Sequence, residues 1–240
     1  MSINKYKWWI IGGLTFVVLA TATGIVIHSR RKNKGVSKNK LKNPKPKSVL
    51  LIGDSVSAIH DYIHNRPINS TYSALVKKEL EPQGIDVDVL AKGAQTTQWM
   101  LDNLPSKLKE KKFDRIYIYG GINDAWNMSV KPEVPFANIQ KMVDLGNEHG
   151  ADVFVVLGYK IDNMMDYRKM KPNNKYTFKS EDYIPYINEY KQFQSQITSK
   201  IKNANFMPVF DLNGQTNDGI HPNAQGHKDL ATIFVNSITE

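Results

Sequence analysis

The sequence predicts an α/β protein built on a parallel sheet, because short apolar runs alternate with helical patterns along residues 48–240. Several of the runs are rich in Val, Ile and Tyr and are apolar enough to be buried on both faces. Strands that are each followed by a helix form a parallel sheet covered on both sides. We therefore expect a three-layer α/β/α sandwich with a five-stranded parallel sheet.

The five expected strands are Ser48–Ile52, Ile85–Ala91, Arg115–Tyr119, Val153–Leu157 and Met207–Leu212. The clearest helices are Asn69–Leu80, Val134–His149, Asp182–Asn203 and Asn223–Ile238. Gly150 stands where a left-handed C-terminal cap is needed, and Asn223 is a candidate N-terminal cap. The stretch 158–181 is too long for an ordinary connection, so it is predicted to be either a loop that covers the substrate or a surface flap.

An uncharged run of twenty residues, 8–27, lies near the N-terminus after a short tail, 1–7. A helix of this length spans about 30 Å, the thickness of the hydrocarbon core of a bilayer. A single transmembrane helix is therefore expected. A signal peptide cleaved near Ala22 is the alternative. The basic, polar segment 28–47 is expected to be a disordered stalk, and 48–240 the folded domain.

Net charge argues against a nucleic-acid partner. The chain carries a formal charge of +9, but residues 1–47 hold eleven Lys or Arg and no acid, which leaves 21 basic against 23 acidic residues beyond them. A domain this close to neutrality binds a phosphate backbone poorly. The basic flank of the apolar run favours a cytoplasmic domain, whereas long domains translocate regardless of flanking charge. We expect a single-pass protein of the cell membrane whose domain is extracytoplasmic.

The first expected strand ends on Gly53-Asp54-Ser55. Sites in parallel sheets form at the carboxyl ends of the strands. Gly53 permits a sharp turn, Asp54 can bind the main chain of the turn, and Ser55 would stand at the N-terminus of a helix. Its N–H would there be without an intrahelical partner, beside a hydroxyl able to attack a carbonyl carbon.

Three further strand ends carry matching chemistry. Gly93 follows the second strand and can present its N–H, and Asn123 follows the third and offers a side-chain amide. Asp218 and His221 follow the last strand, three residues apart. That spacing lets a carboxylate hold one imidazole nitrogen while the other nitrogen faces the Ser55 hydroxyl.

This ordered set resembles the SGNH hydrolases, also called the GDSL esterase/lipase superfamily, over roughly residues 48–238. The matching blocks are Gly53-Asp54-Ser55, Gly93, Gly121-Ile122-Asn123-Asp124 and Asp218-Gly219-Ile220-His221-Pro222. The resemblance implies a flavodoxin-like fold in which Ser55 is the nucleophile, His221 the general base and Asp218 its orienting acid. It implies an oxyanion hole made by the Ser55 N–H, the Gly93 N–H and the Asn123 amide, supported by Gly53, Asp54, Gly121 and Asp124.

The expected function is a serine esterase that removes small acyl groups, such as acetyl, from cell-envelope glycans without a metal or cofactor. Three alternatives stay open: an O-acyltransferase with the same acyl-enzyme, a lipase or thioesterase acting on lipid acyl chains, and an inactive surface-binding module. Trp99, Trp126, Tyr159 and Tyr167 are predicted to line the substrate site, with core packing as the alternative for the two tryptophans. The sequence leaves the acyl group, its acceptor and the oligomeric state open.

Overall fold

The computed structural model describes residues 41–240 except 62–65, 127–129, 162–183 and 218. The expected tail, the expected membrane helix and most of the expected stalk lie outside the described residues, as does most of the long loop. Within the described part of the chain, no helix combines the length and the apolar character needed to cross a bilayer.

Five parallel strands form the central sheet: β1 (Ser48–Gly53), β4 (Asp86–Ala91), β5 (Arg115–Ile118), β6 (Asp152–Val156) and β7 (Asn205–Met207). Their order across the sheet is β4-β1-β5-β6-β7, the flavodoxin-like order. After β1 the chain forms β4 on one side of β1 and then β5 on its other side. The direction in which strands are added to the sheet therefore reverses at β1. A ligand crevice is expected at such a switch point, at the carboxyl ends of the strands. A short antiparallel pair, β2 (His60–Asp61) and β3 (Arg66–Pro67), lies apart from the sheet.

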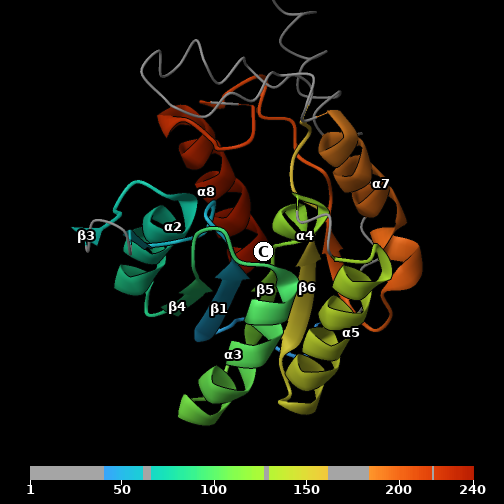
Figure 1. Cartoon of the computed structure of the whole chain (residues 1–240). Coiled ribbons are helices and arrows are strands. Elements are labelled where there is room, and N and C mark those ends of the chain that lie inside the picture. Colours follow the sequence, from blue (N-terminus) through green and yellow to red (C-terminus); the bar gives the residue numbers. More distant parts are fainter. Residues whose placement is uncertain (1–40, 62–65, 127–129, 162–183, 218) are drawn as a thin grey trace, which may run out of the picture. The chain divides into compact units, whose positions relative to one another are not determined.

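Helices cover both faces of the sheet. They are α2 (Tyr72–Leu80), α3 (Thr97–Glu110), α4 (Ile122–Trp126), α5 (Glu133–Glu148), α7 (Ile184–Lys200) and α8 (Ala224–Thr239), with a short 3₁₀ turn η1 (Glu81–Gln83). Helices α2 and α8 lie on one face, and α3 and α5 on the other (Figure 1). Helix α7 packs beside α5, where the rings of Phe136 and Phe193 lie 4.9 Å apart. The expected three-layer arrangement is confirmed.

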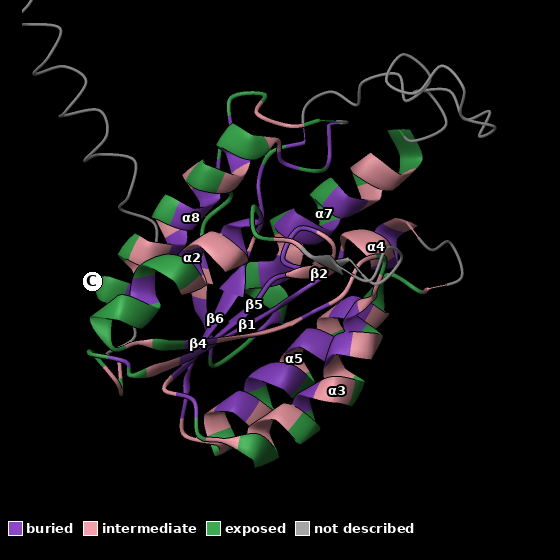
Figure 2. Ribbon diagram, turned by 90° about the vertical axis from the view of Figure 1, so that its left-hand side faces the viewer, coloured by how far each residue is buried: buried purple, intermediate pink, exposed green. Residues whose placement is uncertain are grey.

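The core lies between these layers, with β1, β5 and β6 buried almost throughout (Figure 2). On one face Gly146 lets α5 lie directly on the sheet, since a Cβ atom there would stand 2.6 Å from Val153. On the other face the Tyr117 ring stacks on the Phe154 ring, with the centroids 4.7 Å apart, and its centroid lies 5.6 Å from that of Phe234 in α8. Burial of both faces explains why β1 and β6 read as nearly continuous apolar runs.

The first four strands and the four predicted helices are found within a few residues of their expected bounds. Gly150 has the expected positive φ of 89°. The Asn223 side chain caps α8 by accepting from the N–H groups of Gln225 and Gly226 at 3.0 and 2.9 Å. Helix α3, which contains Pro105, was not predicted, nor was the short helix α4.

The fifth strand exists, but its predicted bounds, Met207–Leu212, are wrong: β7 ends where that strand was expected to begin. Pro208 has no N–H to continue the ladder. Pairing resumes only as an isolated bridge between Tyr159 and Phe210, with the Phe210 N–H donating to the Gly158 carbonyl at 2.8 Å.

Residues 42–47, which we call the N-terminal strap, differ from the disordered stalk expected over 28–47. The main-chain N–H groups of Lys42 and Asn43 donate to the two carboxylate oxygens of Asp152 at 2.8 and 2.7 Å. Asp152 begins β6, so these bonds hold the strap at the amino edge of the sheet. The ordered fold therefore starts before the predicted boundary.

A fully buried arginine, Arg115 at the start of β5, completes this attachment. Its guanidinium donates to the carbonyls of Asn43 and Pro44 in the strap at 3.2 and 3.3 Å. It also donates to the carbonyls of Ser237 and Ile238 at the end of α8, at 2.7 and 3.0 Å. One side chain thus joins the strap to the end of α8 at the amino edge of the sheet.

Candidate active site

The turn after β1 exposes the candidate nucleophile. The Asp54 carboxylate accepts from the Val56 N–H at 3.1 Å, and the Ser57 N–H donates to the Asp54 carbonyl at 3.1 Å. A Cβ atom at Gly53 would lie 2.2 Å from the Ser57 hydroxyl oxygen, so only glycine fits there. The turn leaves Ser55 half-buried at the carboxyl edge of the sheet.

The candidate base comes from the loop before α8. The Nε2 atom of His221 lies 3.0 Å from the Ser55 hydroxyl oxygen. The loop is closed by the Asn217 N–H, which donates to the His221 carbonyl at 2.8 Å. With the ring proton on Nδ1, Nε2 can accept the hydroxyl proton, which is the arrangement that activates a serine. Asp218, the expected partner of His221, and Tyr167 lie outside the described residues.

Three candidate donors belong to segments at the carboxyl edge of the sheet. A Cβ atom at Gly93 would stand 3.9 Å from the Ser55 Cβ, so the Gly93 main chain lies directly beside the serine. Among the described residues, neither the Ser55 N–H nor the Gly93 N–H has an acceptor. Asn123, in α4, donates one amide hydrogen to the Gln95 carbonyl at 2.9 Å and has a second to offer. These groups have the composition of an oxyanion hole.

A buried polar network holds the helix that carries the amide donor. The Asp124 carboxylate accepts from the Thr97 N–H at 2.9 Å and from the Thr97 hydroxyl at 2.6 Å. The Asn138 amide donates to that hydroxyl at 3.1 Å, so α3, α4 and α5 are joined. Gly121, at φ 107°, presents its main chain to the Phe193 ring, since a Cβ atom there would lie 2.5 Å from that ring. Thr97 and Asn138 were missed in the sequence, because nothing local marks them as partners of Asp124.

Two ionisable groups behind the catalytic pair have displaced pKa values. Burial raises the pKa of Asp54 to about 6, although the Val56 N–H and the nearby His221 oppose this shift. Burial lowers the pKa of His227 to about 4, and His221 adds to that effect. Both groups therefore favour their neutral forms more than they would in water.

Of the four aromatic residues predicted to line the substrate site, the structure describes Tyr159, Trp126 and Trp99. Tyr159 is 2% exposed, and its hydroxyl donates to the Ile220 carbonyl, so it supports the His221 loop from inside rather than lining a substrate site. Trp126 is half-buried and stacks on Tyr186 with the ring centroids 5.3 Å apart. Trp99, on α3, is half-buried against the core.

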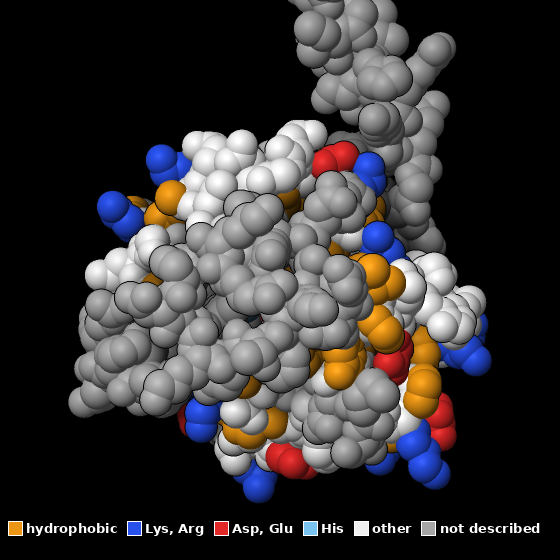
Figure 3. Space-filling view, turned by 45° about the horizontal axis from the view of Figure 1, so that its top comes forward, with side chains coloured by type: hydrophobic (Ala, Val, Ile, Leu, Met, Phe, Trp, Pro, Cys, Tyr) orange, Lys and Arg blue, Asp and Glu red, His pale blue; other side chains and the backbone are white. Residues whose placement is uncertain are grey.

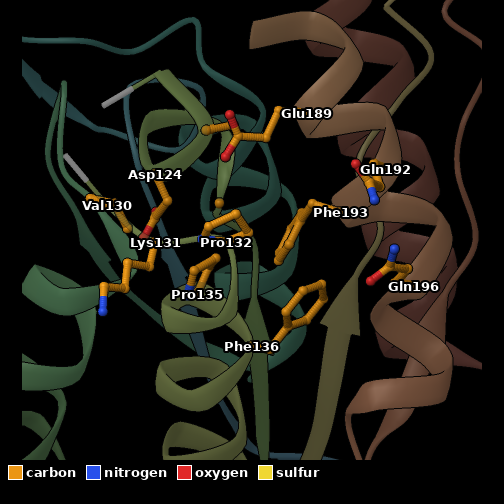
Figure 4. A pocket seen from close by; sticks show the side chains of 12 residues that line it. Asp124, Val130, Lys131, Pro132, Pro135, Phe136, Glu189, Gln192, Phe193 and Gln196 are labelled. Carbon is orange, nitrogen blue, oxygen red and sulfur yellow. The ribbon is translucent and has the colours of Figure 1, made fainter. Parts of the chain in front are cut away.

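A pocket of about 110 Å³ lies between α4, α5 and α7 (Figure 4). Phe136 and Phe193 lie on its inner side, and the polar side chains of Glu189, Gln192 and Gln196 follow one side of α7 around it. Figure 3 shows that the described part of the face at the carboxyl edge carries acidic, basic and hydrophobic side chains together. Groups that bind polar and apolar parts of a ligand are thus both present near α4.

Comparisons with known proteins agree with this arrangement. The model of the GDSL-like lipase/acylhydrolase family matches residues 51–228. No curated protein matches the chain. Similar solved structures include that of TesA, at 22% identity, which covers 77% of this chain and 94% of TesA with a TM-score of 0.53.

A putative lipolytic protein of the G-D-S-L family from Desulfitobacterium hafniense matches at 20% identity, covering 79% of this chain and 98% of its own, with a TM-score of 0.57. An acetylxylan esterase from Geobacillus stearothermophilus matches at 17% identity, covering 80% and 93%, also with a TM-score of 0.57. At these identities the structures show that the fold is shared. The family model, in contrast, extends from β1 through the Ser55 turn and the candidate donors to the start of α8. On that ground this chain belongs to the GDSL-like lipase/acylhydrolase family and is a serine hydrolase of ester bonds.

Proposed function

We propose that the protein is an esterase that removes small acyl groups, such as acetyl, from glycans of the cell envelope. The observation that carries the proposal is the 3.0 Å separation between the Ser55 hydroxyl oxygen and His221 Nε2 at the open edge of the sheet. An inactive binding module would have no need of this pair or of the donors beside it.

The proposed reaction proceeds through an acyl-enzyme. His221 Nε2 takes the hydroxyl proton while the Ser55 oxygen bonds to the ester carbonyl carbon, and the carbonyl electrons move onto its oxygen. The Ser55 and Gly93 N–H groups and the Asn123 amide stabilise that oxyanion. The C–O bond to the sugar then breaks, and the leaving oxygen receives the proton from His221. Water then attacks the acyl-enzyme in the same way, with His221 taking its proton, and the acid is released from Ser55. Asp218 is proposed to orient the imidazole.

The position of the strap supports a glycan rather than a membrane lipid as substrate. The strap lies at the amino edge, and Ser55 follows the carboxyl end of β1, a strand of six residues that is about 20 Å long. The described chain therefore enters the fold on the side opposite the site. With a membrane helix at 8–27 and residues 28–41 as a tether of up to about 50 Å, the site can reach polymers well beyond the bilayer surface.

Anchoring and location are part of the proposal. The uncharged run 8–27 is proposed to be a retained single-pass anchor, with the domain outside the cytoplasm. Protease added to intact cells or to wall-stripped protoplasts is expected to cut before the strap and to release the folded domain. Release of the fragment only after the membrane is broken would place the domain in the cytoplasm and exclude a glycan of the envelope as substrate.

The activity is tested with the full-length protein in detergent. Nitrophenyl esters of acetate, butyrate and laurate report the preferred acyl length, and acetylated glycan fragments report the acceptor. We expect fast cleavage of acetate, slow cleavage of laurate and none by Ser55→Ala. A preference for laurate would favour the lipase alternative, and acetyl transfer to an added sugar in place of release would favour the acyltransferase.

A further inference from the structure

Helices α2 and α8 lie side by side on one face of the sheet, and their first turns are in direct contact (Figures 1 and 2). The main-chain N–H of Tyr72, the first residue of α2, donates to the Nδ1 atom of His227 at 3.2 Å. The N-terminal N–H groups of a helix have no partner within the helix, so His227 satisfies one that would otherwise be without an acceptor. The contact bridges 155 residues of sequence.

On the α2 side, this contact continues to the nucleophile turn. The Tyr72 hydroxyl and the Ser57 hydroxyl lie 2.8 Å apart, and the Ser73 hydroxyl donates to the Ser57 carbonyl at 2.5 Å. Tyr72, Ser73 and Ser57 are fully buried, so water cannot replace these bonds. Because Ser57 is two residues after Ser55, the start of α2 determines where the nucleophile turn lies.

On the α8 side, the contact continues to the base. The main-chain N–H of His227 donates to the Asn223 carbonyl at 2.9 Å in the first turn of α8. The Asn223 N–H donates to the Gln215 carbonyl at 3.1 Å, and its side-chain amide donates to the Gln215 side chain at 2.9 Å. Gln215 and Asn223 thus close the two ends of the loop that carries His221.

His227 can accept the bond only when Nδ1 is unprotonated. Burial lowers the pKa of His227 to about 4, so the ring is neutral and its acceptor persists at neutral pH. The Tyr72 ring adds a second contact with α8, since it lies 4.5 Å from the Phe234 ring. The link between the two helices therefore combines a hydrogen bond with ring packing.

We propose that Tyr72 and His227 form a positioning pair that holds the Ser55 hydroxyl and His221 Nε2 at reacting distance. The nucleophile and the base come from segments 166 residues apart. A chain of contacts, buried at Ser57 and Tyr72 and part-buried at His227, ties one segment to the other. A displacement of about 1 Å between reacting groups can cost about 10²-fold in rate, so the link matters for turnover. The inference rests on the proposed roles of Ser55 and His221 but not on the glycan substrate.

The test compares two substitutions of similar size in the full-length protein. His227→Asn keeps an oxygen acceptor where Nδ1 stands, and His227→Leu places a methyl group there. With nitrophenyl acetate we expect His227→Leu to lower kcat by about tenfold or more with KM within about twofold of the parent protein. We expect His227→Asn to retain kcat within about threefold, because the Tyr72 N–H keeps its acceptor.

His149 provides a matched control. Its Nε2 atom accepts from the Phe113 N–H at 3.1 Å, a bond of the same kind, but at the amino edge of the sheet. His149→Leu is expected to lower the melting temperature without changing kcat. Tyr72→Phe, which removes only the hydroxyl that contacts Ser57, is expected to lower kcat by a few-fold.

Three outcomes would overturn the positioning role: an unchanged kcat in His227→Leu, an equal loss of kcat in His227→Asn, or an equal loss in His149→Leu. The rate at which a fluorophosphonate labels Ser55 gives a second measurement, and it must fall in His227→Leu while the melting curve shows folded protein. Failure of the glycan substrate leaves this test unaffected. A parent protein that neither cleaves nitrophenyl acetate nor is labelled at Ser55 would refute the proposed function itself and this inference with it.

Discussion

The two edges of the sheet use polar groups in opposite ways. At the amino edge, Arg115 and Asp152 direct their charges at main-chain groups of the strap and of α8. At the carboxyl edge, the N–H groups of Ser55 and Gly93 have no acceptor among the described residues, and His221 is exposed. Polar groups that the chain satisfies itself stabilise the fold, whereas groups without a partner are available to a substrate.

This contrast predicts that substitutions at the two edges separate activity from stability. Loss of a side chain at the carboxyl edge removes interactions that form with substrate, so the free energy of unfolding changes little. Loss of one at the amino edge leaves main-chain groups without the partners that the folded state supplies, which destabilises that state. The predictions below test this separation.

The largest effect is expected at the catalytic pair. Ser55→Ala and His221→Ala should each lower kcat/KM for nitrophenyl acetate by about 10³-fold or more, and the double substitution should be hardly worse, because the two residues act as a unit. Thermal unfolding should be nearly unchanged. Additive losses would show that the two side chains act independently, and full activity of Ser55→Ala would exclude it as the nucleophile.

The next effect concerns the amide donor. Asn123→Ala should lower kcat by about 10²–10³-fold with little change in KM, as expected for a donor used mainly in the transition state. Steady-state kinetics with nitrophenyl acetate measure both constants. A variant that unfolds at a much lower temperature but keeps its kcat would give Asn123 a structural role only, through its bond to the Gln95 carbonyl.

At the amino edge the prediction is reversed. Arg115→Met should lower the free energy of unfolding by about 3 kcal/mol, because four carbonyls, the one of Ile238 among them buried, lose the guanidinium donor, while kcat of the folded protein stays unchanged. Lys111→Met is the control, since its ion pair with Asp86 is accessible to water, with the two side chains 28% and 60% exposed, and such a pair is worth about 1 kcal/mol or less. A loss of kcat in Arg115→Met without a loss of stability would remove the contrast between the edges.

The smallest effect tests a carboxyl group at the catalytic edge. Burial raises the pKa of Asp54 from 3.8 to about 6, so the folded state binds this proton more tightly than the unfolded state does. The wild-type protein should therefore lose stability, relative to Asp54→Asn, as the pH rises from about 4 to about 7, by about 2 kcal/mol. Denaturant unfolding of both proteins at these two pH values gives the difference. A difference that does not change with pH would contradict the shift.

Local patterns predicted the elements whose apolar or helical pattern is bounded by clear breaks, such as β1 and α8. They failed at Met207–Leu212, where apolar residues continue but Pro208 ends the ladder, and at α3, whose Pro105 obscured a helix with Met100 and Leu104 on its buried side. At Pro208 the missing N–H, a local feature, ends the ladder, whereas at α3 the tertiary contacts override a local signal. The strap was missed for the same reason. Its lysines are typical of a solvated segment, and only the folded chain brings Asp152 to the main-chain N–H of Lys42.

The sequence alone determined which chemistry meets at the carboxyl edge, because every parallel strand ends there and the residues that follow each strand can be read in order. The tertiary structure decided how far Ser55 stands from His221, and it assigned Tyr159 to the support of a loop rather than to a substrate site. It alone revealed the contact between Tyr72 and His227. Periodicity along a chain reports which side chains are buried, but pairings across more than a hundred residues depend on how whole layers pack, and no local pattern encodes that.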